Sequence, residues 1–184
     1  MDALELLINR RSNKKLVAPA PSREQLEQIF QAALRTPDHG KLKPYRFVII
    51  ENNGLTKLVS GLTQVATDLN LEQKQFDKIN KICTTPMVIA VIARLDPNVA
   101  KVPEWEQLVT AGCAAYSIQL AAQNFGYDNV WITGKWTSGN ALRQLLNCSE
   151  QEKIVALLLV GTAENEKLER ESKTVDTQEF VSYL

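Results

Sequence analysis

The sequence has few residues that could hold a structural metal ion or a disulfide framework. Among 184 residues it contains three cysteines and one histidine. Cys83, Cys113 and Cys148 are widely spaced and form no CxxC pair, so neither a disulfide scaffold nor a zinc site is expected. A single histidine also excludes a histidine-rich metal centre.

Long apolar runs and an excess of either charge are missing as well. The longest apolar runs, residues 87–93 and 154–160, hold seven residues each, far fewer than the roughly 20 that span a bilayer. Lys plus Arg and Asp plus Glu both number 21, which argues against nucleic acid or an anionic membrane as the main partner. The first residues carry acids where a signal peptide carries bases. We therefore expect a cytoplasmic globular protein.

The signatures of several common enzyme classes are absent. There is no GxGxxG after a predicted strand, no GxxxxGK[ST] phosphate loop and no GxSxG nucleophile elbow. One histidine cannot serve both a catalytic triad and a metal site. If the chain is an enzyme, we expect a bound cofactor to supply the chemistry, and we assign no side chain as a catalytic acid or base.

Helix and strand patterns alternate from end to end. We predict helices at 2–9, from Ser22 to Pro37, at 55–69, 103–125 and 140–146, with a weaker helical pattern around 76–82. Strands are predicted at 46–51, 87–93, 129–133 and 153–160. This order indicates a layered α/β/α architecture around a small sheet, of the kind that often completes its core by dimerising.

Two segments point to contacts beyond a single chain. The helix at 103–125 carries small side chains at 111–115 and 121–122 and no polar face, so it should be buried in the core or against another subunit. Residues 164–184 hold six acids and three bases before an apolar tip. We interpret them as an arm that lies over another surface.

Three polar segments could carry a ligand. Residues 10–15 combine arginine forks, a serine hydroxyl and lysines, which suit a phosphorylated cofactor, although a solvated basic patch is the alternative. Residues 35–39 and 43–45 place the single histidine on a loop, where ligand contacts concentrate. Residues 131–133 end a strand, where α/β sheets bind ligands, although an aromatic in the core is the alternative for Trp131.

These segments together resemble the FMN-dependent nitroreductase family. The Arg-Arg-Ser-Asn-Lys at 10–14 resembles the R-x-S-x-K opening of that family. The Arg-Thr-Pro-Asp-His at 35–39, with the following Lys-Pro-Tyr, is similar to the helix end and loop before its first strand. The segment 103–107, with 111–114, Gly126 and Trp131, resembles the short, YdjA-type branch of NAD(P)H nitroreductases. The resemblance covers nearly the whole chain.

The resemblance implies a fold and an assembly. It implies an α+β, three-layer α/β/α fold with a central mixed, mainly antiparallel sheet, completed by dimerisation. Residues 1–184 would form one domain, with 164–184 as a C-terminal arm that crosses to the partner subunit. The homodimer would hold FMN at its interface, touched by both subunits.

It also implies the site residues. Arg10, Arg11 and Ser12 would hold the flavin phosphate and ribityl chain. Lys14 would lie near flavin N1 and O2, where negative charge develops on reduction. Arg35 and His39 would reach the flavin from the partner subunit. The ring edge would be lined by Trp131, Ile132 and Thr133. The nicotinamide nucleotide is associated with Ala121, Ala122, Gln123, Asn124, Phe125 and Gly126.

The implied function is an oxidoreductase that passes hydride from NADPH or NADH through flavin N5 to a nitroaromatic, quinone or similar small acceptor by a ping-pong mechanism. Three alternatives stay open. The chain could be a flavin-binding module without turnover, serving as a sensor or store. It could perform a specialised reaction, such as reductive dehalogenation, under a lid at 69–82. It could bind another phosphate-bearing ligand without flavin. One departure from the family concerns its usual Gln-Pro-Trp, which is here Lys43-Pro44-Tyr45.

Overall fold

The computed structural model describes residues 2–82, 84–165 and 175–184. Cys83 and much of the predicted C-terminal arm, residues 166–174, lie outside the described residues. Within the described ranges, no helix has the length and apolar character needed to cross a membrane.

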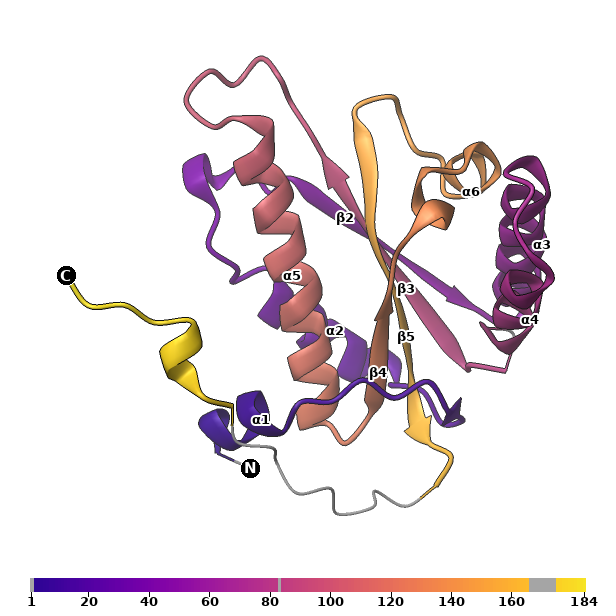
Figure 1. The fold of residues 1–184 in the computed structure, drawn as a ribbon, viewed down its shortest axis with the longest axis horizontal. Helices are drawn as coiled ribbons and strands as arrows, with labels where there is room; N and C mark the ends of the chain where they lie inside the picture. The colour runs from indigo at the N-terminus through magenta and orange to yellow at the C-terminus, as the bar shows by residue number, and fades with distance from the viewer. Residues whose placement is uncertain (1, 83, 166–174) are drawn as a thin grey trace.

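One five-stranded sheet runs through the molecule, with β5 (Glu152–Ala163) at its centre (Figure 1). On one edge β5 pairs with β3 (Met87–Arg94), which in turn pairs with β2 (Tyr45–Glu51). The strand β5 also pairs with β4 (Asp128–Ile132) through its residues 157–161. Its last two residues, 162 and 163, pair with β1 (Leu16–Val17). Every pairing among the described strands is antiparallel. The family resemblance implied a mixed sheet, and the described residues show no parallel pair.

Helices cover both faces of this sheet. On one face lie α2 (Arg23–Ala33) and α5 (Glu104–Asn124), and on the other α3 (Asn53–Asp68), α4 (Gln73–Ile82) and α6 (Asn140–Leu145) (Figure 1). Residues 87–93 of β3 are buried on both faces, as predicted. Alternate side chains of β3 pack into the hydrophobic cores on the two faces of the sheet, because successive residues of a strand point to opposite faces. The predicted three-layer α/β/α architecture is confirmed.

Local sequence signals set the ends of the main helices. The Ser22 hydroxyl accepts from Gln25 N–H and the Gln25 side chain accepts from Ser22 N–H, which is the predicted capping box of α2. Pro103 precedes the first turn of α5, and Gly126 adopts φ +89° just after its end. That left-handed conformation, which glycine adopts without steric cost, turns the chain from α5 into β4.

Several shorter helices lie between or beside the strands and helices described above. They are α1 (Ala3–Asn9) and three 3-10 helices, η1 (His39–Lys41), η2 (Lys135–Ser138) and η3 (Thr177–Glu179). The strand β1 was not predicted, since its two residues show no alternation of their own. The helix α2 ends at Ala33, ahead of the predicted stop at Pro37.

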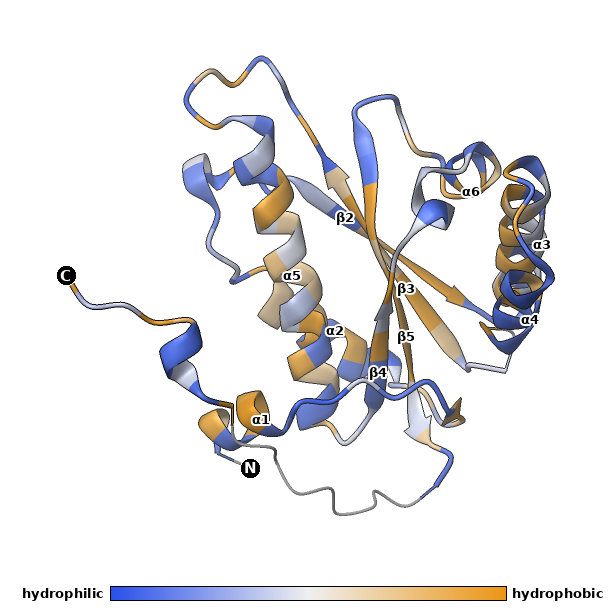
Figure 2. Cartoon of the chain, in the orientation of Figure 1, coloured by the Kyte–Doolittle hydropathy of each residue, from blue (hydrophilic) through white to orange (hydrophobic). Residues whose placement is uncertain are grey.

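The outward face of α5 is apolar, as the small-residue pattern predicted. One side of the helix packs Ala111, Ala115 and Ile118 against the sheet, while Trp105 and Val109 on the other side are 65% and 55% exposed. Figure 2 shows the helix pale to orange between its ends. The described C-terminal residues 175–184 are also exposed, and they extend away from the core (Figure 1).

Candidate functional site

The cationic segment, residues 10–15, crosses from α1 to β1 past the end of α5 and the start of β4 (Figure 1). The backbone N–H of Asn13 donates to Asn129 O over 3.0 Å, and its side-chain Nδ2 donates to Asp128 Oδ2 over 2.8 Å. The Gln123 Nε2 donates to Arg11 O over 3.1 Å. These bonds fix the backbone of a segment that the sequence alone shows only as a run of charges.

A buried pair of amides supports this attachment from inside the fold. The Gln119 Nε2 donates to Asn129 Oδ1 over 2.7 Å, and Asn129 Nδ2 donates to Gln119 O over 2.9 Å. Both residues are buried. Sequence reasoning missed these residues. The available signal was the pair of glutamines at 119 and 123, one helical turn apart on an otherwise small-sided helix.

The four charged side chains of the cationic segment end in groups that donate hydrogen bonds. The Arg10 Nη1 lies 3.5 Å from Ser12 Oγ, so these two groups are close together. The Arg11 Nη1 donates to Ile8 O and Arg10 O at the end of α1, which ties part of this guanidinium to its own chain. Lys14 is exposed and forms no hydrogen bond or ion pair with the described residues.

Arg35 and His39 lie on the loop that follows α2. The Asp38 carboxylate holds this loop by accepting from the backbone N–H groups of Leu42 and Lys43. The His39 Nδ1 lies 2.7 Å from Glu106 Oε2, in the first turn of α5. Both Arg35 and His39 are exposed. This loop is thus attached to the N-terminal end of α5.

His39 and the cationic segment therefore contact opposite ends of one helix. His39 contacts α5 at Glu106, and Arg11 contacts it at Gln123. These two positions are about 25 Å apart along the helix axis, at a rise of ~1.5 Å per residue. One chain does not bring His39 to the cationic segment.

Trp131 and Ile132 are half-buried on β4, and Thr133 is exposed just beyond it. The Trp131 side chain packs on the α2 and α5 side of the sheet, whereas Ile132 packs on the other side. Beyond the contact with Asn13, the edge of β4 that faces away from β5 has no strand partner among the described residues. This edge offers main-chain groups as well as the predicted side chains.

The segment 121–126 is the end of α5 and the turn after it. Ala122 is fully buried, so its side chain is not available to a nucleotide. Ala121 and Phe125 pack against the same core, while Asn124 and Gly126 are exposed. The Gln123 amide holds the backbone of Arg11 through its Nε2.

Comparison with known families decides what kind of protein carries these features. Residues 7–162 match the model of the Nitroreductase family. The chain belongs to the nitroreductase family. A protein of Haemophilus influenzae named "Putative NAD(P)H nitroreductase" is 53% identical over the full length of both chains. A protein of Escherichia coli K12 with the same name and the suffix YdjA is 40% identical, also over both full lengths.

A solved structure shows that the fold is shared too. The structure from Clostridium difficile R20291, described as an FMN-dependent nitroreductase, superimposes with a TM-score of 0.73 over 98% of each chain. Its sequence identity is 23%, so this likeness concerns the fold. The resemblance of the sequence to the nitroreductase family and to its YdjA-type branch is confirmed.

Lys43 and Tyr45, which replace the Gln and Trp that are usual in the family, lie in different surroundings. Tyr45 is buried and stacks on Phe47, with ring centroids 5.4 Å apart. Its pKa is raised by burial and by the nearby Asp38 carboxylate. Lys43 is exposed on the loop of His39. Tyr45 therefore belongs to the core beneath α2, and Lys43 remains at the surface.

Among the described residues, the carboxylate with the largest pKa shift lies outside the candidate site. The Arg46 guanidinium donates two hydrogen bonds to Glu152, with Nε–Oε1 and Nη2–Oε2 distances of 2.7 and 2.9 Å. These bonds lower the pKa of Glu152 from its ordinary 4.5 to about 2. Arg46 also donates to the carbonyls of Leu146 and Asn147. This network joins β2 to the loop before β5 and has a structural role.

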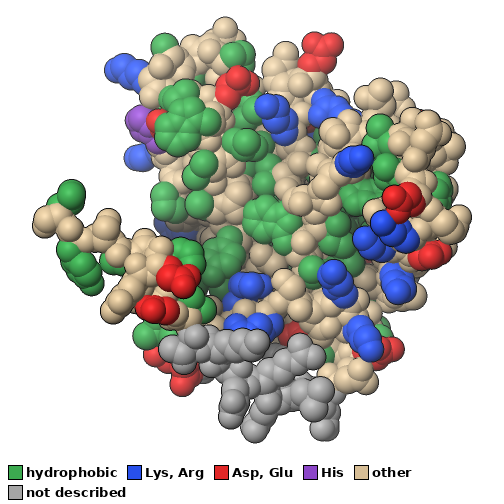
Figure 3. Space-filling view, in the orientation of Figure 1, with side chains coloured by type: hydrophobic (Ala, Val, Ile, Leu, Met, Phe, Trp, Pro, Cys, Tyr) green, Lys and Arg blue, Asp and Glu red, His purple; other side chains and the backbone are tan. Residues whose placement is uncertain are grey.

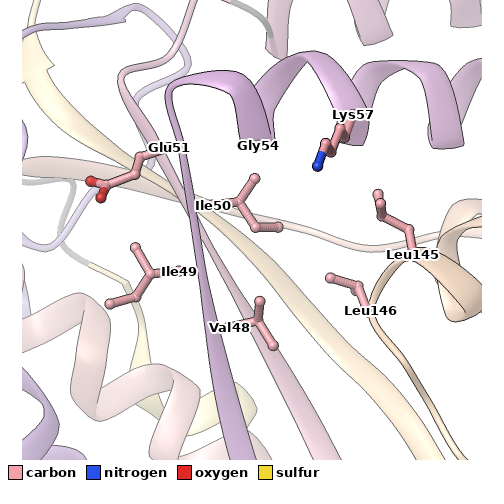
Figure 4. Close-up of a pocket in the computed structure, with 8 residues that line it drawn as sticks. All are labelled: Val48, Ile49, Ile50, Glu51, Gly54, Lys57, Leu145 and Leu146. Carbon is pink, nitrogen blue, oxygen red and sulfur yellow. The ribbon is translucent and has the colours of Figure 1, made fainter.

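One cavity in the nitroreductase fold involves none of the predicted site residues. It has a volume of about 210 Å³ and lies between β2, the start of α3 and the end of α6 (Figure 4). The side chains of Ile49 and Glu51 point away from Leu145 and Leu146 (Figure 4). The walls are mainly apolar side chains of the core, so we do not assign this cavity to the candidate site.

Proposed function

We propose that this protein is an FMN-dependent oxidoreductase that passes hydride from NADPH or NADH to a nitroaromatic, quinone or similar acceptor by a ping-pong mechanism. The observation that carries the proposal is the cationic segment, fixed by Asn13 and Gln123 against the end of α5 and the start of β4. The names of the relatives support NAD(P)H as reductant. The C. difficile structure supports FMN.

The donor set of the cationic segment fits the phosphate of FMN. The Arg10 guanidinium and the Ser12 hydroxyl lie together on one short stretch, and a guanidinium fork with a hydroxyl matches phosphate oxygens. The fixed backbone lowers the entropy lost on binding. Arg11 adds positive charge beside them and also caps α1. We assign these three residues to the phosphate and ribityl chain.

Lys14 and the edge of β4 would act on the ring system. When bound, FMN supplies the hydride-accepting and hydride-donating atom that the chain itself lacks. The ammonium of Lys14 has no described partner, so it remains available to stabilise negative charge that develops next to it. Trp131, Ile132 and Thr133 would line the ring edge. The protein then binds and orients the reactants without a catalytic acid or base.

A second copy of the chain would complete this site. The exposed apolar face of α5 requires a cover, since exposed apolar patches mark interaction surfaces. His39 contacts the opposite end of α5 from the cationic segment of its own chain, but a partner subunit could bring its Arg35 and His39 to this segment. We propose a homodimer with FMN at the interface. Residues 1–184 would form one domain, and residues 164–184 an arm that crosses to the partner.

The visible absorption spectrum of the purified full-length protein tests this proposal. The protein is incubated with FMN, desalted and then mixed anaerobically with NADPH or NADH. We expect a flavin spectrum that bleaches on reductant and recovers when a nitroaromatic acceptor is added. A flavin spectrum that never bleaches would favour a binding module without turnover. A protein that retains no flavin would overturn the proposal and leave the cationic segment to another phosphate-bearing ligand.

A further inference from the structure

A larger cavity lies between the connection from α3 to α4 and the 3-10 helix η2, beyond the end of β4. It has a volume of about 480 Å³ and is lined by Lys74 and Lys78 of α4 and Lys135 of η2. Among the described residues that line it, Glu72 is the one acidic side chain. We call this space the lysine cavity. Its wall carries a net positive charge, although the whole chain has none.

Two of these lysines are available to a ligand. Lys74 forms an ion pair with Glu72. Lys78 and Lys135 are exposed and form no side-chain hydrogen bond or ion pair within the part of the chain that the structure describes. Two such ammonium groups on separate elements of one cavity attract a phosphate or carboxylate group, each offering three N–H donors.

The wall also contains an aromatic surface. Trp136 is half-buried on η2 and lines the cavity together with Gly134. Gly134 adopts φ +110°, a backbone conformation that favours glycine, and it lies next to the indole of Trp136. The face of an indole stacks on planar rings and attracts cations. The cavity therefore combines a ring surface with positive charge.

The position of the lysine cavity relates it to the proposed flavin site. Thr133 lines the cavity and directly follows Trp131 and Ile132, which we assign to the edge of the flavin ring. In the view of Figure 3, many Lys and Arg side chains lie on the right half of the molecule, the half where α3 and α4 lie in Figure 1. A molecule that meets the flavin at this edge would extend into the lysine cavity.

We infer that the lysine cavity binds an anionic group together with a nearby planar ring, as part of a molecule that exchanges hydride at the proposed site. This inference rests on the proposed function. Two sources share the chemistry. One is the adenosine half of NADPH, with its 2′-phosphate on Lys78 and Lys135 and its adenine on Trp136. The other is an aromatic acceptor that carries a carboxylate.

The test compares the double variant Lys78→Gln, Lys135→Gln with a control, Lys101→Gln, Lys153→Gln. Lys101 and Lys153 are also exposed and form no side-chain ion pair with the described residues, so both variants change the net charge equally. The first arm measures the Kd of adenosine 2′,5′-bisphosphate and of adenosine 5′-phosphate by calorimetry. It needs no flavin, so its result is independent of the proposed function. The second arm compares kcat/KM for 4-nitrobenzoate and nitrobenzene with NADH as reductant.

We expect the cavity variant to lose about tenfold in affinity for adenosine 2′,5′-bisphosphate or about tenfold in kcat/KM for 4-nitrobenzoate. The neutral acceptor, or the nucleotide without the 2′-phosphate, should change little. A loss in the first arm assigns the cavity to NADPH, and a loss in the second assigns it to the acceptor. Equal values for the wild type and the cavity variant in both arms would overturn the inference. So would an equal loss in the control, which would show an effect of net charge.

Discussion

The Asn13 side chain donates to Asp128 Oδ2 over 2.8 Å and joins two residues that are 115 positions apart. The same asparagine donates its backbone N–H to Asn129 O and accepts from Lys15 N–H through Oδ1. It therefore connects the cationic segment to the first residues of β4 and also shapes the turn within the segment. The positions of Arg10, Ser12 and Lys14 depend on this attachment.

Replacing Asn13 should loosen the segment without unfolding the protein. We expect Asn13→Ala to raise the Kd of FMN about tenfold, since a hydrogen bond to a charged group contributes ~1.5–3 kcal/mol. Fluorescence titration with FMN measures this, and circular dichroism checks the fold. The control is Asn98→Ala, whose side chain bonds only to Asp96 in a surface loop. An unchanged Kd for Asn13→Ala would argue against the positioning role.

The arginines should dominate the affinity for FMN. We expect Arg10→Ala together with Arg11→Ala to weaken FMN binding about a hundredfold or more, because two charge-assisted contacts of ~1.5 kcal/mol each are lost. Flavin retained after gel filtration is the readout. Arg23→Ala with Lys153→Ala removes the same charge elsewhere, since the Arg23–Glu51 pair lies at the surface and such pairs contribute little.

Because Arg11 also caps α1, the single variant Arg10→Ala separates ligand contact from helix capping. Full retention of flavin by both the single and the double variant would remove the cationic segment from the site.

Lys14 should set the redox potential of the flavin more than its binding. We expect Lys14→Met to retain FMN and to lower its reduction potential, because a cation that stabilises the reduced, negatively charged form is gone. A redox titration against a reference dye measures the potential. The neighbouring Lys15→Met is the matched control, as its exposed side chain has no described partner. An unchanged or higher potential in Lys14→Met would contradict the assignment.

Acid should weaken the fold through Glu152. The Arg46 guanidinium lowers the pKa of this carboxylate from its ordinary 4.5 to about 2, so the folded state binds its proton less readily than the unfolded state. The stabilisation is therefore fully present above pH 4.5 and is lost as pH falls toward 2. Urea unfolding between pH 5 and 3 should show a steeper loss for the wild type than for Glu152→Gln. Equal slopes would show that this ion pair is not responsible.

The apolar face of α5 should hold two subunits together. We expect Val109→Asp to shift the protein from dimer to monomer, because a charge would replace a half-exposed valine in the covered patch. Light scattering after gel filtration measures the mass. Leu69→Asp introduces the same charge at another exposed apolar position, at the end of α3, and should leave the mass unchanged. A monomeric wild type, or a Val109→Asp protein that stays dimeric, would exclude this interface.

Much of the secondary structure can be predicted from local sequence. The run at 87–93 predicts a doubly buried strand because continuous apolar residues leave neither face for solvent. The Ser22 and Gln25 pair predicts the start of α2, since the capping bonds join residues three apart. The motifs at 10–14, 35–39 and 103–114 together indicated the family, because the residue types and spacing of each occur within a short stretch of chain.

Only the tertiary structure decided what fixes the candidate site. The Asn13–Asp128 bond, the Gln119–Asn129 amides and the Arg46–Glu152 pair join elements that are distant in sequence, and no periodicity reports such partners. The two residues of β1 form a strand because β5 pairs with them. The length of α5 separates His39 from Arg11 within one chain, a distance that local sequence patterns do not give. Local sequence determines helices and strands through short-range bonding and burial, whereas the geometry of a polar site depends on which distant groups the fold brings within bonding distance.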